Sequence, residues 1–179
     1  MAATRTVIVC NQCGAFWDPA VEQAACTDPS HEHSRFDSHL HRTRVVLPDR
    51  TEVTAVSFGS ADPYAREVAP DFGLYLDARW RPPWPHDHVD WPDFGVPGDS
   101  VLVVAVLESL LDRARAGQRV EIGCYGGHGR TGTALACLAI LRGHAPGEAV
   151  SWVRATYCER AVETDEQEAF ARNLTPVRE

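Results

Sequence analysis

The sequence predicts an α/β fold: a central β-sheet of about four or five strands flanked by helices, preceded by a small Cys/His-rich module. Buried-strand patterns alternate with apolar helical patterns, and a Gly-rich turn joins a strand at 120–122 to a helix at 133–141. A cluster of cysteines and histidines near the start of the chain predicts the separate module. With 179 residues, 44% of them hydrophobic, the chain can bury one sizeable core. We assign residues 1–43 to the module and residues 44–179 to the α/β domain.

The module contains a pattern that is typical of structural zinc sites. Cys10 and Cys13 form a Cys-x2-Cys pair, and Cys26 lies five residues before His31. Three thiolates and one imidazole can close a tetrahedron around zinc. We expect Cys10, Cys13, Cys26 and His31 to be the ligands, with His33 as the alternative histidine. Two other interpretations remain open: ordinary reduced cysteines beside surface histidines, or a redox pair formed by Cys10 and Cys13.

The first half of the α/β domain reads as strands and an aromatic loop. Residues 44–58 alternate around a Pro-Asp turn and predict a β-hairpin, and residues 73–77 predict a short strand. The segment that follows is rich in tryptophan and proline and should border the functional site. We expect its rings to pack against the body of the domain rather than to stack on a ligand.

The second half reads mainly as helices. An apolar helix begins at Gly98 or Asp99 and ends at Gly117, and Pro146 opens a helix over 147–157. Thr164 as N-cap with Gln167 three residues later forms a capping box that opens the last helix.

The turn between strand 120–122 and the apolar helix holds the residues for attack on a phosphate ester. It reads Cys124-Tyr125-Gly126-Gly127-His128-Gly129-Arg130-Thr131. Its glycines let consecutive N–H groups converge on an anion, and the helix dipole adds positive potential that also favours the Cys124 thiolate. The planar fork of Arg130 can bind two phosphate oxygens at once, and Thr131 can donate a hydrogen bond to the sulfur.

A second chemical feature lies upstream, in the segment from Trp91 to Pro97. Expulsion of an alkoxide or phenoxide needs a proton donor, and Asp93 lies between Pro92 and Gly95 on a turn that can move. Asp90 competes with Asp93 only by proximity. This segment therefore supplies the candidate general acid.

Together, Cys-x5-Arg-Thr-Gly after a strand and Trp-Pro-Asp-x-Gly-Val-Pro before it resemble the cysteine-dependent protein tyrosine phosphatase superfamily. The Cys-Tyr-Gly-Gly-x-Gly-Arg run is most similar to the dual-specificity branch. The resemblance implies that Cys124 attacks phosphorus, that Asp93 acts as acid and then as base, and that no metal takes part in catalysis. It also implies that residues 125–130 bind the phosphate: Tyr125, Gly126, Gly127, His128, Gly129 and Arg130.

The sequence departs from this family at two positions. Glu163-Thr164-Asp165-Glu166-Gln167 resembles a Gln-Thr-x-x-Gln segment whose glutamines position the hydrolytic water, but the first position is glutamate. Glu163 and Gln167 are therefore candidates for positioning water, beside the capping interpretation of Gln167. Gly123 stands where the family usually has a histidine that supports the thiolate, and His128 is a candidate to replace it or to face the substrate.

Composition narrows the partners. The net charge is −8, which disfavours nucleic acid and anionic membrane surfaces, and the loop lacks the lysines of phosphoinositide-selective relatives. We expect phosphoprotein substrates, phosphotyrosine or dual-specificity; the alternative is a pseudophosphatase that binds phosphoproteins without turnover. All 17 cationic residues are arginine, as in GC-rich bacterial genomes. The thiolate chemistry and the lack of a signal or apolar span favour the cytoplasm, and the oligomeric state stays open.

Overall fold

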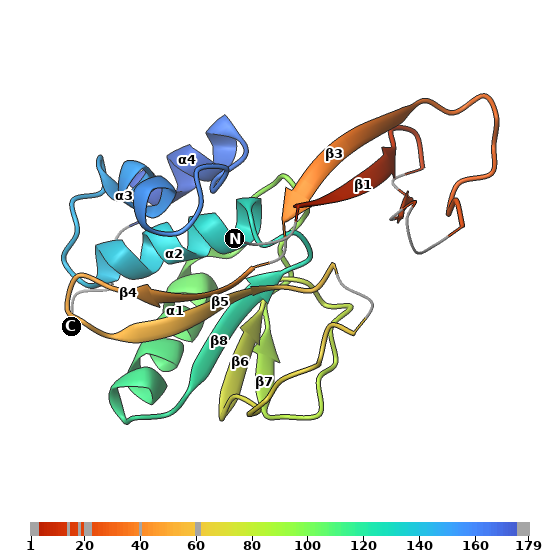
Figure 1. Ribbon diagram of the computed structural model, residues 1–179. Helices are drawn as coiled ribbons and strands as arrows, with labels where there is room; N and C mark the ends of the chain where they lie inside the picture. Colours follow the sequence, from red (N-terminus) through yellow and green to blue (C-terminus); the bar gives the residue numbers. More distant parts are fainter. Residues whose placement is uncertain are drawn as a thin grey trace. The chain divides into compact units, whose positions relative to one another are not determined.

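The computed structural model describes residues 4–13, 15–17, 19, 23–39, 41–59 and 62–174. The chain forms two compact units, residues 1–40 and residues 41–179. Figure 1 shows the elements of each unit. Residues 41–43, which the sequence groups with the module, belong to the second unit because the first strand of its sheet begins at Arg42.

The N-terminal unit contains a three-stranded antiparallel sheet in the order β2-β1-β3. Its strands are β1 (Thr4–Cys10), β2 (Phe16–Trp17) and β3 (His33–His39). The sequence does not predict these strands, because the apolar periodicity of this segment is slight. The buried cluster of this unit is small and consists of Cys10, Trp17 and Cys26, with Ile8 and Ala15 packed against it.

The second unit is built on a mixed five-stranded sheet in the order β4-β5-β8-β6-β7. The predicted hairpin is confirmed as β4 (Arg42–Val46) and β5 (Glu52–Ser57), which pair antiparallel. The other neighbours pair in parallel. They comprise β6 (Phe72–Tyr75), β7 (His86–His88) and β8 (Val120–Cys124). β8 extends through Gly123, where the sequence predicts that the strand ends, and ends at Cys124.

The helices of this unit are α1 (Ser100–Arg115), α2 (Gly129–Leu141), α3 (Ala149–Thr156) and α4 (Asp165–Arg172). α1 begins at Ser100, directly after the predicted start at Gly98 or Asp99, and Asp99 caps it by accepting a hydrogen bond from the N–H of Leu102. α2 begins four residues before the predicted start at Thr133: Gly129, Thr131 and Gly132 have low helix propensity, but the buried contacts of Arg130 and Thr131 hold this first turn. α3 begins at Ala149, two residues after the predicted start.

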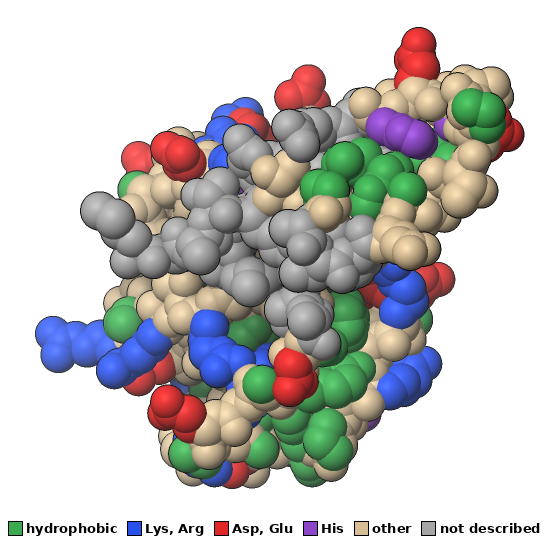
Figure 2. Space-filling view, turned by 45° about the vertical axis from the view of Figure 1, so that its right-hand side comes forward, with side chains coloured by type: hydrophobic (Ala, Val, Ile, Leu, Met, Phe, Trp, Pro, Cys, Tyr) green, Lys and Arg blue, Asp and Glu red, His purple; other side chains and the backbone are tan. Residues whose placement is uncertain are grey.

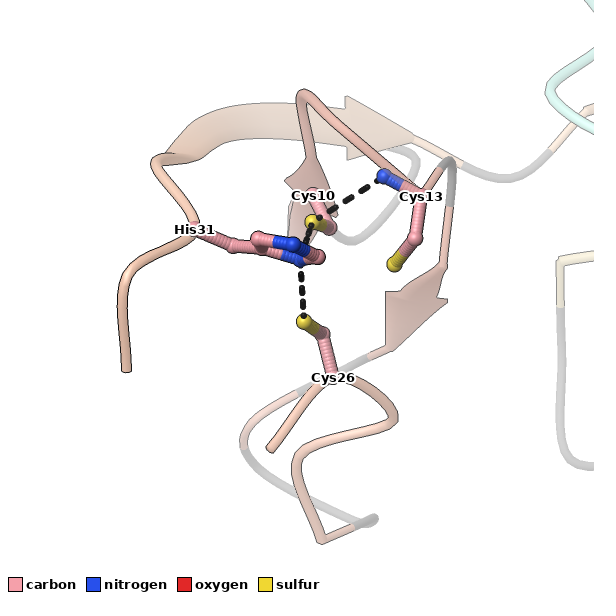
Figure 3. Close-up of side chains that lie close together, drawn as sticks. All are labelled: Cys10, Cys13, Cys26 and His31. Carbon is pink, nitrogen blue, oxygen red and sulfur yellow. Dashed lines mark hydrogen bonds between the residues drawn. The ribbon is translucent and has the colours of Figure 1, made fainter. Parts of the chain in front are cut away.

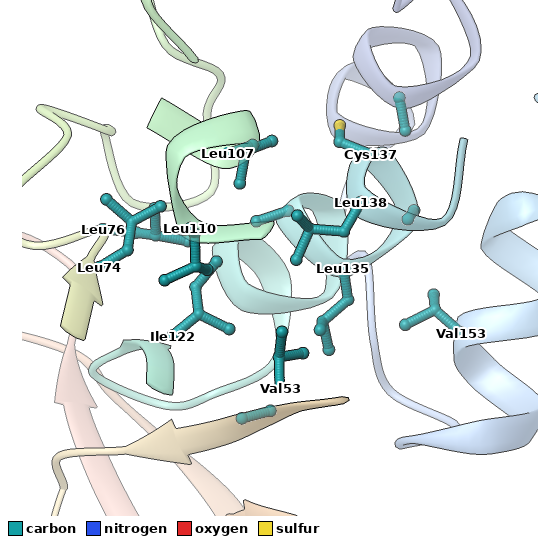
Figure 4. Packing of buried hydrophobic residues seen from close by; sticks show 14 of the residues in the cluster. Val53, Leu74, Leu76, Leu107, Leu110, Ile122, Leu135, Cys137, Leu138 and Val153 are labelled. Carbon is teal, nitrogen blue, oxygen red and sulfur yellow. The ribbon is translucent and has the colours of Figure 1, made fainter. Parts of the chain in front are cut away.

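The main core lies between one face of the sheet and the helices. Leu107 and Leu110 of α1 and Leu135 and Leu138 of α2 pack over Ile122 of β8, as Figure 4 shows. The opposite face carries an aromatic cluster, which we define as Val56, Phe58, Tyr75 and Trp84 with Tyr64 and Trp80 packed against it. The predicted α/β sheet flanked by helices is thus confirmed, and the aromatic loop closes its second face.

The parallel strands place the functional segments at one edge of the sheet. β5, β8 and β6 are neighbours and parallel, so the residues that follow Ser57, Cys124 and Tyr75 emerge at the same edge. On the surface that Figure 2 shows, arginine and acidic side chains are both spread among apolar ones. Within the described ranges, none of the helices has the length and apolar character that a membrane crossing requires.

Candidate active site

The phosphate loop runs from Cys124 at the end of β8 to Gly129 at the start of α2. Gly127 has a φ of 74°, which a side chain would strain, and a Cβ there would lie 2.9 Å from Cδ2 of His41. The N-cap residue His128 does not cap α2 with its side chain, so the positive end of the helix dipole faces the loop, and the Glu163 carboxylate accepts a hydrogen bond from the N–H of Gly129. The loop therefore offers backbone donors and a helix dipole to an anion.

The candidate nucleophile is Cys124, whose side chain is buried next to a hydroxyl donor. Cys124 is 3% exposed to solvent. Thr131 lies in the first turn of α2 and donates a hydrogen bond from Oγ1 to the sulfur at 3.1 Å. A donor to sulfur stabilises the thiolate both as nucleophile and as leaving group. The expected pairing of these two side chains is therefore present in the structure.

Arg130 lies buried beside the loop and is anchored from three sides. Its Nη1 donates to the carbonyls of Leu76 and Trp91 at 3.1 and 3.3 Å, and to Oδ2 of Asp77 at 3.2 Å. Its buried Nε has no hydrogen-bond partner in the described part of the chain. A buried guanidinium nitrogen without an acceptor is costly, and a phosphate oxygen is the acceptor that would satisfy it.

Asp93 lies against this arginine, with its Oδ1 at 3.1 Å from Nη2 of Arg130. The side chain of Asp93 is 62% exposed, whereas that of Arg130 is 5% exposed. The turn around Asp93 is fixed by Nε1 of the buried Trp91, which donates to the Gly95 carbonyl at 2.9 Å. The candidate acid thus faces the phosphate-binding arginine while keeping access to water.

The segment before α4 fastens this turn to the body of the domain. Oγ1 of Thr164 donates to the Phe94 carbonyl at 3.2 Å, and Nε2 of Gln167 donates to the Gly95 carbonyl at 3.3 Å. Thr164 also accepts the backbone N–H of Gln167, so the predicted N-cap is confirmed. Oε1 of Gln167 accepts the N–H of Glu163 at 2.9 Å. These bonds occupy the Gln167 amide, and its role in positioning water stays a prediction.

Glu163 brings a carboxylate to the first turn of α2. A Cβ on Gly129 would lie only 2.3 Å from its Oε2, so the glycine lets the carboxylate approach the helix this closely. Burial raises the pKa of Glu163 above its ordinary value, and the nearby charge of Asp93 adds to the effect. The position that is glutamine in the tyrosine-specific branch is therefore an acid whose charge is disfavoured here.

Asp77 is a functional residue that the sequence reasoning missed. It follows β6, it is 6% exposed, and it holds both Nη1 of Arg130 and the guanidinium of Arg79. Burial alone raises the pKa of Asp77, but hydrogen bonds from Arg79 and the charge of Arg130 outweigh it and lower that pKa. One feature of the sequence could have identified Asp77: it lies at the end of a predicted strand. Residues that follow neighbouring parallel strands meet at one edge of the sheet.

Gly123 is required by the packing of β8. A Cβ at this position would lie 2.5 Å from the Val56 carbonyl oxygen and 2.6 Å from its Cγ2. The family's histidine therefore cannot be accommodated without a shift of β5. His128 is 5% exposed, and its Nε2 lies 3.2 Å from Nε2 of His41. The histidine of the loop is thus engaged by His41, which belongs to the same unit.

The rings of the aromatic loop pack against the body of the domain, as expected. Trp80 stacks on Phe58 with ring centroids 4.2 Å apart, and it also lies over Tyr125 of the phosphate loop at 6.1 Å. Nε1 of Trp84 donates to the hydroxyl of Tyr75. The cluster therefore supports the phosphate loop from the face opposite the helices.

In the N-terminal unit, the structure gathers Cys10, Cys13, Cys26 and His31 within 4.8 Å of one another. Figure 3 shows the imidazole between two sulfurs, with Nδ1 of His31 3.3 Å from the Sγ atoms of Cys10 and Cys26. His33 lies outside this cluster and packs edge-on against Trp17. Burial alone raises the pKa of Cys10, yet hydrogen bonds from the backbone of Cys13 and Gln12 outweigh it and lower that pKa to about 6.

The comparisons with known proteins agree with this geometry. Residues 97–176 match a family described as Swiss Army Knife protein, DSP-PTPase phosphatase domain. A relative from Methanocaldococcus jannaschii, the uncharacterized protein MJECL20, is 38% identical over 109 residues, which cover 54% of this chain and 71% of the relative. This relative is archaeal, so the bacterial source expected from composition stays a prediction.

Solved structures show the same fold. Tk-PTP in its active form has a TM-score of 0.53 and 29% identity, covering 59% of this chain and 78% of that chain. The kinase associated phosphatase has a TM-score of 0.56 at 19% identity, covering 74% and 92%, which shows the fold alone. Fold, phosphate loop and relatives define the class: the chain belongs to the dual-specificity-phosphatase-like branch of the cysteine-dependent protein tyrosine phosphatase superfamily.

Proposed function

We propose that this protein hydrolyses phosphomonoesters through a cysteinyl-phosphate intermediate, on phosphotyrosine or dual-specificity phosphoprotein substrates. The observation that carries the proposal is the buried Nε of Arg130, which lacks an acceptor among the described residues next to the Gly-rich loop. A dianionic phosphate would give this nitrogen its acceptor and would occupy the backbone donors of the loop.

In the first step, the Cys124 thiolate attacks phosphorus, and the new S–P bond replaces the P–O bond to the leaving group. Asp93 donates its proton to the departing oxygen. Arg130 and the loop amides stabilise the negative charge on the equatorial oxygens. The Thr131 hydroxyl, 3.1 Å from the sulfur, limits the cost of holding a thiolate in a site that is nearly closed to water.

In the second step, water attacks phosphorus and loses a proton to Asp93, and the S–P bond breaks to release phosphate and the thiolate. The exposed position of Asp93 supports this role because the attacking water must reach it. Glu163 and Gln167 lie next to the acid turn and the start of α2, where that water would approach. This placement supports their proposed part in orienting it.

The alternative is a pseudophosphatase that binds a phosphoprotein without turnover. Such a protein would need the loop and Arg130 but would have no use for an acid. The ion pair between Asp93 and Arg130 therefore favours an active enzyme. A reducing compartment such as the cytoplasm suits a thiolate nucleophile, and this location remains our expectation.

Hydrolysis of p-nitrophenyl phosphate without added metal tests the proposal. We expect Cys124→Ser to abolish turnover while inorganic phosphate still binds, and Asp93→Ala to lower kcat by about 10²- to 10⁴-fold. Asp90→Ala is the matched control and should change kcat by less than about threefold. Turnover in the Cys124→Ser variant would exclude the mechanism, whereas phosphate binding by an inactive wild type would favour the pseudophosphatase.

Zinc bound by the N-terminal cluster is the second part of the proposal. Cys10, Cys13, Cys26 and His31 supply the three thiolates and one imidazole of a structural site. Oδ2 of Asp28 lies 3.5 Å from Nε2 of His31, so this carboxylate can orient the ring from the side opposite the sulfurs. Among the side chains that the structure describes in this unit, the buried apolar cluster holds Cys10, Trp17 and Cys26, and a small cluster of this kind gains stability from a further constraint such as a metal ion. Elemental analysis should find stoichiometric zinc in carefully purified protein.

A further inference from the structure

A second cluster of side chains that could bind a metal lies in the unit formed by residues 41–179, which we call the catalytic unit because it carries the candidate active site. These side chains take no part in the mechanism above. His41, His128 and Cys158 bring one ligand atom each within 4.8 Å of the others, and all three are buried. Their exposed fractions are 6%, 5% and 6%. Two imidazoles and one thiol converging inside a domain form a ligand set that suits zinc.

The geometry of the two imidazoles fits a shared metal ion. Nε2 of His41 and Nε2 of His128 lie 3.2 Å apart. Two nitrogens bound tetrahedrally to one zinc ion at about 2.0 to 2.1 Å would lie roughly 3.3 to 3.4 Å apart. The rings meet nearly at right angles, with an interplanar angle of 80°, and the short distance between their Nε2 atoms brings both nitrogens within reach of one ion. The simplest alternative is a single N–H···N hydrogen bond between two neutral rings, which this distance also permits.

The three ligands come from segments that are far apart in the chain and are each held in place. The N–H of His41 donates to Oγ of Ser57 at 2.7 Å, which fixes the start of β4 against the end of β5. The carbonyl of His128 accepts the N–H of Gly132 at 2.7 Å, and that of Cys158 accepts the N–H of Ala161 at 2.9 Å. These bonds fix the three backbone positions, so a metal ion would meet a largely preformed site.

The position of His128 connects this cluster to the phosphate loop. This residue lies inside the phosphate loop, between Gly127 and Gly129. The hydroxyl of Tyr157, next to Cys158, already donates to the Gly127 carbonyl at 2.7 Å. A metal ion on His128 would add a second fastening at the same turn, from the side of the loop that faces His41.

We propose that His41, His128 and Cys158 bind a zinc ion that fastens the phosphate loop to the start of β4 and to the turn after α3. Three protein ligands leave a fourth coordination position for water. The site is distinct from the N-terminal cluster, and its occupancy does not depend on turnover. Its failure would therefore leave the phosphatase proposal standing, and the reverse also holds.

The test uses Co²⁺ as a spectroscopic probe in the full chain. A Cys10→Ser/Cys13→Ser/Cys26→Ser background removes the three N-terminal thiolates, and one equivalent of Co²⁺ should then bind with visible bands of a tetrahedral site and a charge-transfer band from sulfur. Adding Cys158→Ser should abolish these bands, and adding Cys124→Ser should leave them unchanged. His41→Gln is a second variant that should lose the same equivalent if Cys158→Ser does not fold.

Thermal unfolding gives an independent readout in the same background. Saturating Zn²⁺ should raise Tm by about 5 °C, and this shift should disappear in the Cys158→Ser and His41→Gln variants. Absence of Co²⁺ binding in the folded background protein would overturn the proposal in favour of the N–H···N hydrogen bond. Loss of the bands on Cys124→Ser would overturn it too, because the nucleophile would then be the ligand.

Discussion

The two units of this chain reach a defined structure by different means. The catalytic unit buries a continuous hydrophobic core between its sheet and helices, whereas the buried cluster described in the N-terminal unit consists of Cys10, Trp17 and Cys26. In the first, hydrocarbon burial provides the stability and polar residues are available for chemistry. In the second, three cysteines and one histidine lie together, and the zinc ion that we propose there would supply the stability that the small buried cluster does not. The difference teaches how the environment assigns different proposed roles to one residue type, with cysteine as nucleophile in one unit and as metal ligand in the other.

Removal of metal should produce the largest difference in stability between the two units. We expect a zinc chelator to abolish hydrogen-exchange protection in residues 4–39, because the small core cannot hold the strands alone, while protection of residues 42–174 persists. His31→Gln should have the same effect. His33→Gln is the matched control, since this ring lies outside the cluster and packs on Trp17. Protection of residues 4–39 that survives chelation would remove the basis of the comparison.

Within the catalytic unit, the largest effect outside the nucleophile and acid should come from Asp77. Asp77→Ala frees Nη1 of Arg130 from its buried partner, and we expect kcat/KM to fall about 100-fold because the guanidinium loses its alignment. The inhibition constant for inorganic phosphate should rise in parallel, which a change in the acid alone would not cause. Asp71→Ala, which removes an exposed ion pair with Arg119, serves as control and should be neutral. Unchanged phosphate inhibition would argue against a positioning role.

Substitution of Gly123 should affect the core of the catalytic unit and leave the metal content of the other unit unchanged. Gly123→Ala places a Cβ against the Val56 carbonyl, and we expect a loss of about 1 to 3 kcal/mol in the free energy of unfolding by urea. Gly98→Ala is the control, since no atom lies within 4 Å of its Cβ position. Equal stability of both variants would show that β5 can yield, and that packing does not explain the missing histidine.

The smallest effect should come from Glu163→Gln. This change removes a negative charge beside the start of α2, and we expect KM for p-nitrophenyl phosphate at pH 7 to fall about threefold. Because the pKa of Glu163 is raised in the folded state, its contribution to stability falls as pH rises through and above its ordinary value of 4.5. The variant should therefore gain thermal stability over wild type at pH 7 but not at pH 4. An equal difference at both pH values would contradict the raised pKa.

The sequence predicts most of the catalytic unit because its signals are local. The hairpin at 44–58, the helix that starts near Asp99 and the capping threonine at 164 each depend on residues a few positions apart, and all three are confirmed. The start of α2 is missed because glycine and threonine have low intrinsic helix propensity. The strands of the N-terminal unit are missed because their pairing does not follow an apolar alternation.

Only those residues of the site that belong to short sequence motifs can be predicted from the sequence. Cys124, Arg130 and Asp93 belong to recognisable short segments, and the structure brings them together. Asp77 belongs to no recognisable motif. It lies beside the phosphate loop because β6, which precedes it, is a neighbour of β8 in the sheet. His41 and Cys158 are likewise separated from His128 by long stretches of chain. Contacts of this kind arise from topology, which a pass along one sequence does not reveal.

The ion pair between Asp93 and Arg130 also has a consequence for timing. Nη2 of Arg130 is held by the acid, and an arriving phosphate would need the same nitrogen for a bidentate contact. The acid turn is further tied to α4 through the Phe94 and Gly95 carbonyls. Capture of a phosphate therefore requires an exchange of partners at one nitrogen, which couples release of the arginine by the acid turn to binding of the substrate.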